Sequence, residues 1–233
     1  MPSKYIVKEY VSGGIYHVYN RGVDKRDIFL DEQDYNFFIF LIKSYILPLS
    51  EQKTNVETRM QKGVFYGRIE ILAYALMPNH YHLLIKQNDK IDIAEFMRAL
   101  MTSYVSYFNS KYERSGHLFG GVFKAILVKN DDYILHLSRY IHLNPIATRL
   151  NLAERCNNLR GSTLLIELPR YYTSYYDYLH PNGLGRNMVN SNIILEYFNT
   201  KDSDVLYSTD SYKSFVEETA INGSEYLGIY TLE

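Results

Sequence analysis

The sequence predicts an α+β fold in which one antiparallel sheet has helices packed on one of its faces. Segments with strand and helix patterns follow one another in the order strand, helix, strand, strand, helix, strand, helix. The two consecutive strands are joined directly by Pro78-Asn79, and so short a connection pairs neighbouring strands antiparallel. With 233 residues, 46% of them hydrophobic and 22% charged, the chain is long enough to bury one large core.

The first strand and the first helix lie near the N-terminus. Residues 14–20 predict a strand, which Arg21-Gly22 closes. Residues 31–47 carry apolar and aromatic side chains at helical spacing, and Pro48 ends this helix. The polar stretch over residues 50–63 predicts a loop before the next strand.

The central segment supplies two strands and a long helix. Residues 68–77 predict an apolar strand buried on both faces, and the turn then leads directly into a strand over residues 80–86. Asp92 followed by Glu95 predicts a helix start of the capping-box kind. The apolar stripe that follows reaches Phe108, which predicts a helix packed on the sheet.

The last strand and helix of the pattern come next. A glycine-containing stretch over residues 116–121 ends the long helix, and residues 122–128 predict a strand. A final helix, capped by Asn130 or Asp131, is expected to reach about Leu143 and to end before Pro145.

The pattern weakens after Arg149, where short helices are indicated only over residues 193–198 and 212–219. We therefore expect one domain over residues 1–150 and a C-terminal extension over residues 151–233, rather than a second full domain.

Composition excludes several classes of protein. The single cysteine, Cys156, excludes an intrachain disulfide framework and a cysteine-rich zinc site. No run of about 18 apolar residues is present, so we expect no membrane-spanning helix. The first residues lack the apolar stretch and cleavage site of a secretory signal, which predicts a cytoplasmic protein.

The net charge of −1 weighs against a generic nucleic-acid binder, because phosphate neutralisation usually requires a basic excess. A local basic groove is nevertheless compatible with a neutral total. The chain has 24 tyrosines and no tryptophan. Tyrosine can stack on bases, but filling core and half-buried surface accounts for most of these residues.

A candidate metal site lies in the strand that begins at His80. Side chains alternate faces along a strand, so His80 and His82 point the same way, about 6.6 Å apart along the chain. Tyr81, Leu83 and Ile85 then point towards the helices, and the two imidazoles lie on the open face. Imidazole suits zinc, manganese or iron and accepts magnesium less readily. The alternative is a pair of structural histidines that hydrogen-bond to their neighbours.

The final helix carries a second polar pair. Tyr140 and Asn144 are four residues apart and share one face of the helix, about 6 Å from each other. They can present a phenol and an amide oxygen to the same centre. The alternative is a core tyrosine and an asparagine that ends the helix.

Several separated runs resemble the REP-associated tyrosine transposases, which are relatives of the single-tyrosine HUH transposases of small insertion sequences. The runs are Met-Pro-Asn-His-Tyr-His-Leu-Leu at residues 77–84, Ser-Gly-His-Leu-Phe at residues 115–119 and Arg-Tyr-Ile-His-Leu-Asn-Pro at residues 139–145. Residues 16–22 resemble the first strand of that family, and residues 214–218 resemble its tail more loosely.

The resemblance implies a ferredoxin-like fold and a catalytic domain over residues 1–150. It implies a divalent metal, Mg²⁺ or Mn²⁺, bound by His80 and His82, with Asn144 as a third polar residue at the metal. It implies that Tyr140 is the nucleophile, which cuts and rejoins single-stranded DNA through a 5′-phosphotyrosine intermediate. The expected partner is single-stranded DNA with a hairpin or repeat, which associates the protein with the nucleoid, and a homodimer is possible in this family.

Cations and one aromatic side chain near these runs are candidate DNA contacts, since they can reach phosphates or stack on bases. The alternative is an ordinary solvated charged surface. Relatives commonly carry a basic residue where Val122 stands. The candidates are Arg21, Lys25, Arg26, Lys86, Arg114, His117, Phe119 and Lys124.

Two other functions remain open. The first is a DNA-hairpin-binding module of the same fold with little or no cutting activity. The second is a metal hydrolase of the double-stranded β-helix type, which also uses His-x-His on a strand. That site usually adds an acidic residue soon afterwards, where this chain has Lys86 and Gln87.

Overall fold

A computed structural model describes residues 10–48, 63–153, 172–180, 188–199 and 212–222. Residues 1–9, most of the loop expected at 50–63, and Cys156 lie outside these ranges. The elements are β1 (Ile15–Arg21), a 3₁₀ turn (Val23–Lys25), α1 (Glu32–Ile46), β2 (Ile69–Met77), β3 (His80–Gln87), α2 (Asp92–Lys111), β4 (Lys124–Leu127), α3 (Asp131–Ala153), α5 (Tyr175–Leu179), α6 (Asn192–Asn199) and α7 (Tyr212–Asn222).

The four strands form one sheet in the order β2-β3-β1-β4, and every neighbouring pair is antiparallel. The chain visits them as β1-α1-β2-β3-α2-β4, which is the ferredoxin-like arrangement. The α+β fold with an antiparallel sheet is therefore confirmed. An open sheet of four strands with helices is not a double-stranded β-helix, so that hydrolase fold is excluded.

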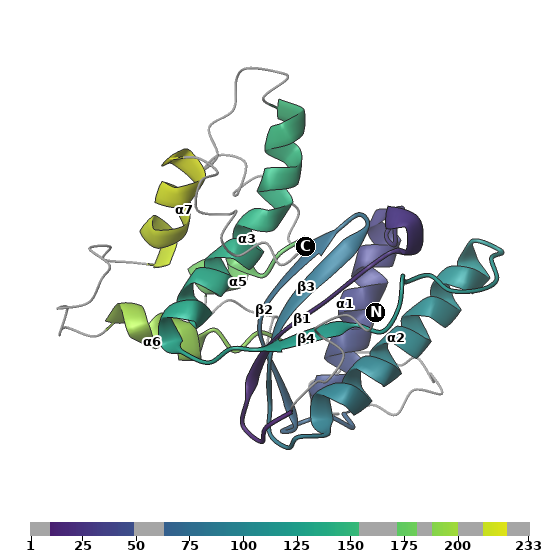
Figure 1. The fold of residues 1–233 in the computed structure, drawn as a ribbon, viewed down its shortest axis with the longest axis horizontal. Helices are drawn as coiled ribbons and strands as arrows, with labels where there is room; N and C mark the ends of the chain where they lie inside the picture. Colours follow the sequence, from purple (N-terminus) through teal and green to yellow (C-terminus); the bar gives the residue numbers. More distant parts are fainter. Residues whose placement is uncertain (1–9, 49–62, 154–171, 181–187, 200–211, 223–233) are drawn as a thin grey trace, which may run out of the picture.

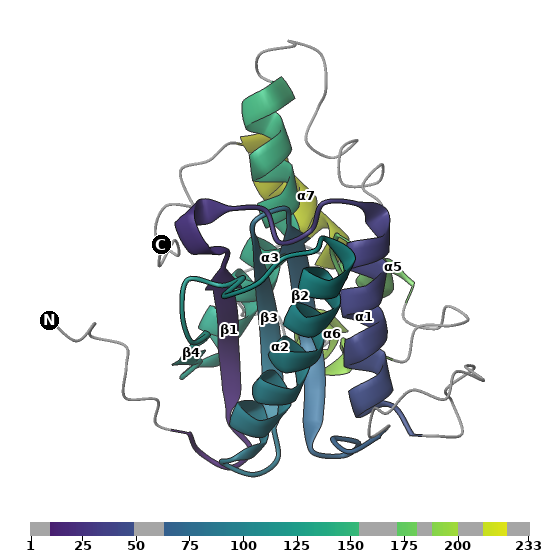
Figure 2. The same ribbon diagram turned by 90° about the vertical axis from the view of Figure 1, so that its right-hand side faces the viewer.

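Helices α1 and α2 lie side by side over one face of the sheet (Figures 1 and 2). The side chains of Tyr81, Leu83 and Ile85 belong to the core on this face, as the alternation along β3 predicts. The expected helix over residues 31–47 is confirmed, and Asp31 begins it with a capping box to Asp34.

The opposite face of the sheet is also covered, so the expectation of helices on one face was wrong. Helix α3 crosses this face, and α5, α6 and α7 pack beside it (Figure 1). Ala73 and Ala75 of β2 and Leu84 of β3 are fully buried in this second core. Small alanine side chains allow α3 to approach β2 closely.

The C-terminal residues also cover the edge of the sheet. In the outer strand β2, Leu76 N donates to the Tyr172 carbonyl. The Tyr74 carbonyl of the same strand accepts from Ser174 N. Asn190 N donates to the Ile71 carbonyl further along the same edge. An exposed strand edge is a site of unwanted pairing, and these bonds protect part of it. The division of the chain at residue 150 stays a prediction.

Two helix ends differ from the sequence prediction. The capping box expected at the start of α2 was wrong, because Asp92 and Glu95 bind Arg68 at 2.6 Å instead. Helix α3 continues through Pro145 to Ala153. Proline removes only one backbone donor, and both Leu143 and Pro145 are buried in the packed part of the helix. No helix in the described ranges is long and apolar enough to cross a membrane.

Candidate active site

The register of the sheet places several polar side chains under α3. His82 of β3 lies opposite Tyr19 of β1 and Ala75 of β2, and His80 lies opposite Arg21. Because directly opposed residues of an antiparallel pair share a face, these side chains all point towards α3. The alternation along β3 therefore puts both histidines on one face, as predicted.

The turn before β3 fixes the position of His80. The Pro78 carbonyl accepts from the backbone N–H groups of Ile28 and Phe29, and the Asn79 carbonyl accepts from Gly22 N. Asn79 Oδ1 lies 2.6 Å from His80 Nδ1. The rings of His80 and His82 are 5.1 Å apart between centroids and nearly perpendicular. The two imidazoles therefore stand close enough to share one ion.

Helix α3 brings the phenol and the amide to the same place. The Tyr140 ring lies edge-on to the His82 ring, with centroids 5.6 Å apart. One turn later, Asn144 Nδ2 lies 3.4 Å from His82 Nε2. Tyr140 is only 6% exposed and His82 only 1%. The expectation that the histidines lie on an open face was wrong, since α3 covers them.

His17 of β1 also belongs to this cluster, and the sequence analysis did not single it out. Its Nε2 lies 2.8 Å from His82 Nδ1, and the two rings are stacked at 5.0 Å. His17 is 2% exposed, and its Nδ1 is buried with no hydrogen-bond partner among the described residues. The sequence signal was a histidine in a strand-like run, but only strand pairing places it against His82.

Burial controls the protonation of these rings. It holds the pKa of the His82 imidazole well below its usual value, and neighbouring His17, His80 and Arg21 lower that pKa further. Burial lowers the pKa of His17 to about 3. Both imidazoles are therefore neutral near pH 7, and neutral imidazole is the form that binds metals.

A metal ion here would rest on a neutral set of donors. Among the described residues, no three His, Cys, Asp or Glu side chains are grouped to hold an ion. His80 and His82 supply two nitrogens, and a half-turn of the Asn144 amide puts its oxygen where its nitrogen now lies. This N, N, O set fits manganese, and magnesium less readily, with water or phosphate oxygens completing the coordination.

Several candidate DNA contacts surround the same end of the sheet. Asn79 Nδ2 donates to the Lys25 carbonyl, and Gly22 pairs with Phe119, so the three loops at this end are joined. Lys124 lies opposite Tyr19 in the sheet register, with its Nζ 5.2 Å above the Tyr19 ring. Lys25, Arg26, His117 and Lys124 are all exposed, whereas Arg21 is half-buried.

Three of the candidates have other surroundings. Lys86 lies opposite Ile15 at the far end of β3, and its Nζ pairs with Glu70 at 3.2 Å. The structure does not bring Lys86 to the histidines. Phe119 is buried and packs edge-on against Tyr81 in the core under α1 and α2, so its ring is not available to stack on a base. The Arg114 guanidinium lies over the Phe108 ring.

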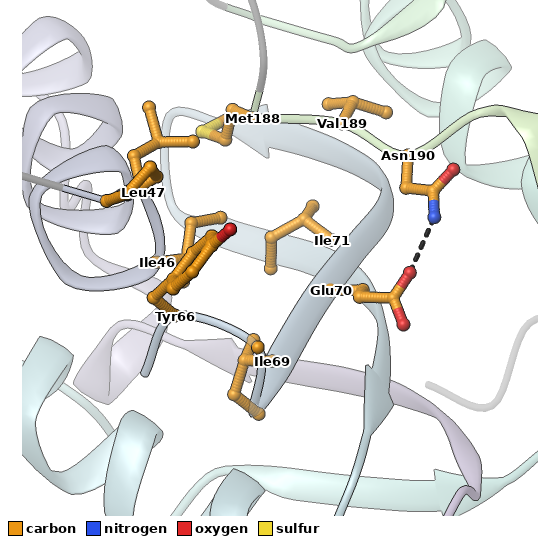
Figure 3. Close-up of a pocket in the computed structure, with 11 residues that line it drawn as sticks. Ile46, Leu47, Tyr66, Ile69, Glu70, Ile71, Met188, Val189 and Asn190 are labelled. Atoms are coloured by element: carbon orange, nitrogen blue, oxygen red, sulfur yellow. Dashed lines mark hydrogen bonds between the residues drawn. The ribbon is translucent and has the colours of Figure 1, made fainter. Parts of the chain in front are cut away.

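A pocket of about 390 Å³ lies at the other end of β2. Figure 3 shows its mostly apolar lining, with Glu70 and Asn190 hydrogen-bonded at one side. Ile69 and Ile71 pair with the end of β3 remote from His80. The pocket is therefore separate from the cluster of imidazoles.

A match to one protein family supports the resemblance that the motifs indicate. The family described as "Transposase IS200 like" matches residues 42–144, a little under half of the chain. A structure of a REP-associated tyrosine transposase bound to a REP hairpin is 15% identical, with a TM-score of 0.49, and the match covers 80% of this chain and 91% of that one. A putative transposase from Deinococcus radiodurans is 17% identical, with a TM-score of 0.36 and coverage of 60% and 95%. No curated protein matches the chain.

Proposed function

We propose that this chain, whose residues 42–144 match the IS200-like transposases, cuts and rejoins single-stranded DNA with Tyr140 as the nucleophile. The observation that carries the proposal is the position of the Tyr140 ring, 5.6 Å from the ring of His82. Both residues lie inside the matched segment, although they come from different elements. A helix and a strand that meet in this way place a phenol beside a potential metal ligand.

Tyr140 supplies the attacking oxygen. Its Oη forms a bond to phosphorus, the bond from phosphorus to the 3′ oxygen breaks, and that oxygen takes up a proton as the phenol loses one. The products are a 5′-phosphotyrosine and a free 3′-OH. A later attack by a 3′-OH reverses the step and releases Tyr140, so rejoining needs no ATP. Such a displacement requires in-line geometry, which a nucleophile on a packed helix can maintain.

His80, His82 and Asn144 are the residues that would hold a divalent metal, Mg²⁺ or Mn²⁺. When bound, such an ion neutralises charge on a non-bridging phosphate oxygen and contributes several kcal/mol of transition-state stabilisation. The neutral imidazole of His82 keeps its lone pair available at neutral pH. Burial under α3 excludes bulk water from one side of the cluster.

The proposed substrate is single-stranded DNA that carries a hairpin or repeat, as the motif resemblance implies. Exposed cations near the histidines, including Lys25, Arg26 and Lys124, support phosphate binding at this end of the sheet. Their local grouping is compatible with the net charge of −1. Phosphate contacts position the strand, whereas sequence preference must come from base contacts.

The proposal is tested by trapping the covalent intermediate. Hairpin-flanked single-stranded DNA labelled at its 3′ end is incubated with the protein and Mn²⁺, and the products are separated on a denaturing gel. The label is expected to move with the protein, because the 3′ fragment keeps the phosphate bound to tyrosine. Tyr140→Phe should abolish this species, whereas the control Tyr66→Phe, an exposed tyrosine, should leave it unchanged. Hairpin binding with no adduct would instead support a binding module.

A further inference from the structure

His17 touches the candidate site but has no part in the chemistry described above. It lies on β1, outside the segment that matches the transposase family. Its Nε2 is 2.8 Å from Nδ1 of His82, a distance at which one proton must lie between the two nitrogens. Whether His17 or His82 carries that proton decides which nitrogen of His82 keeps a lone pair.

Two tautomers are possible, and only one is useful for binding a metal. If His17 donates, neutral His82 must carry its own proton on Nε2, the atom that faces Asn144. If His82 donates from Nδ1, its Nε2 keeps the lone pair, and the Asn144 amide at 3.4 Å can donate to it. The orientation of the Asn144 amide, with Nδ2 towards the His82 ring, fits the second tautomer.

His80 also has a hydrogen-bond partner at its Nδ1, which is the side chain of Asn79. Asn79 Nδ2 donates to the Lys25 carbonyl at 3.2 Å, which leaves Asn79 Oδ1 as the atom beside His80. An amide oxygen only accepts, so the neutral form of His80 carries its proton on Nδ1 and keeps its lone pair on Nε2. Each imidazole of β3 therefore has a partner at its Nδ1. For His82 the partner is His17 of β1, and for His80 it is Asn79 of the preceding turn.

We propose that His17 is a positioning residue, which accepts the Nδ1 proton of His82 and so keeps Nε2 of His82 ready to bind a divalent metal. The inference rests on the proposed function in taking His82 as a ligand. In metal-binding histidines, a hydrogen-bond partner at the ring nitrogen that does not bind the metal fixes the tautomer and the ring orientation. As a histidine, His17 provides a neutral acceptor and adds no charge beneath α3.

A feature of His17 itself supports this role. When its Nε2 accepts, its own proton lies on Nδ1, which is buried and has no hydrogen-bond partner among the described residues. A buried donor without a partner is destabilising, and such groups often mark functional positions. A purely structural ring stacked on His82 would not need nitrogen at all, so His17→Phe separates packing from hydrogen bonding.

The first test reads the tautomer of His82 without metal. Ring ¹⁵N chemical shifts of the full-length protein distinguish a protonated nitrogen from one with a lone pair. The proton of His82 is expected on Nδ1 in the wild type and on Nε2 in His17→Phe. A wild-type His82 that carries its proton on Nε2 would overturn the inference, whether or not the protein binds a metal.

The second test measures affinity for Mn²⁺ by following the signal of the free ion. His17→Phe is expected to weaken binding by about 10-fold to 100-fold, the usual effect of losing such a partner. His17→Gln puts an amide oxygen near the former Nε2 and should recover most of the affinity. The control His180→Gln changes an exposed histidine and should have no effect.

The outcomes separate the two proposals. If the wild type binds Mn²⁺ and His17→Phe binds it equally well, the role of His17 is wrong while the proposed function stands. Equal weakening in His17→Phe and His17→Gln also contradicts the acceptor role. If the wild type binds no Mn²⁺, the proposed function fails, and the tautomer measurement still decides the role of His17. Circular dichroism identifies a variant that does not fold, and the wild-type tautomer then provides the deciding result.

Discussion

His82 has a different neighbour at each ring nitrogen and on its edge. His17 lies at Nδ1, Asn144 lies at Nε2, and the Tyr140 ring meets the imidazole edge-on. Each contact restricts the ring in a different direction, so its orientation is set before any ligand arrives. At the scale of single residues, preorganisation of this kind is what a transesterification site requires.

Asn144 offers a direct test of the donor set. Asn144→Ala should weaken Mn²⁺ binding by about tenfold, or about 1.4 kcal/mol, because one neutral oxygen ligand is lost. Asn144→Asp should tighten binding, because an anionic oxygen takes its place. Titration of Mn²⁺ into each variant measures both changes. Unchanged affinity in both variants would show that Asn144 is not a ligand.

The buried His142 predicts a dependence of stability on pH. Burial lowers its folded-state pKa to about 3, whereas the unfolded pKa is about 6.5. The unfolded chain therefore binds the extra proton first, so this stability is fully present above about pH 6.5 and is lost as the pH falls towards 3. At pH 5 the loss from His142 should be about 2 kcal/mol.

Urea unfolding at pH 7 and pH 5 measures this effect, with His142→Gln as the comparison. The variant is less stable at both pH values, but it should lose about 2 kcal/mol less than the wild type between them. His17, with a pKa near 3, adds a similar loss that both proteins share. Equal losses in the wild type and the variant would contradict the assignment to His142.

At the scale of elements, α3 connects the candidate site to the C-terminal helices. On the side of α3 away from the imidazoles of the sheet, His142 Nε2 lies 2.7 Å from Ser174 Oγ. Its Nδ1 lies 2.7 Å from Tyr212 Oη, and the Tyr212 hydroxyl donates to Ser138 Oγ. These buried contacts hold the helix that carries Tyr140 against α5 and α7.

Tyr212→Phe tests whether this anchor matters. Loss of the hydroxyl removes one buried hydrogen bond from His142 Nδ1 and one from Ser138, which should destabilise the fold by about 1–3 kcal/mol. The rate of adduct formation should also fall, since the position of Tyr140 depends on α3. The control Tyr66→Phe removes a hydroxyl from an exposed tyrosine and should change stability by less than about 0.5 kcal/mol. Similar stability in both variants would contradict an anchoring role.

The elements also show what sequence patterns can and cannot predict. Alternation along β3 correctly separates His80 and His82 from Tyr81 and Leu83, because the strand period depends only on local geometry. The extension of α3 past Pro145 was not predicted, because proline usually ends a helix and local patterns do not show that this proline is buried. His17 was missed for the same reason, because strand pairing is non-local.

At the scale of the whole molecule, the arrangement of charge matters more than its total. The net charge is −1, yet Lys25, Arg26, His117 and Lys124 are exposed near the end of the sheet that carries His80. Lys86 lies at the opposite end and is paired with Glu70. The order and faces of the strands, which short-range patterns do not specify, decide which cations can act together.

DNA binding is therefore expected to depend on some lysines and not on others. Lys25→Ala and Lys124→Ala should each weaken binding to single-stranded DNA and reduce the slope of log affinity against log salt by about 0.7. Lys86→Ala should leave both unchanged. Fluorescence anisotropy over a series of salt concentrations measures these slopes. An effect of Lys86→Ala as large as that of Lys124→Ala would place the DNA elsewhere.

The most direct test of the central claim is to identify the residue that carries the DNA. After the adduct is digested with nuclease and trypsin, mass spectrometry locates the phosphonucleotide on a peptide. We predict that it lies on residues 140–149, in which Tyr140 is the only tyrosine. Attachment to a tyrosine in any other peptide would contradict the assignment of Tyr140 and the site built around it.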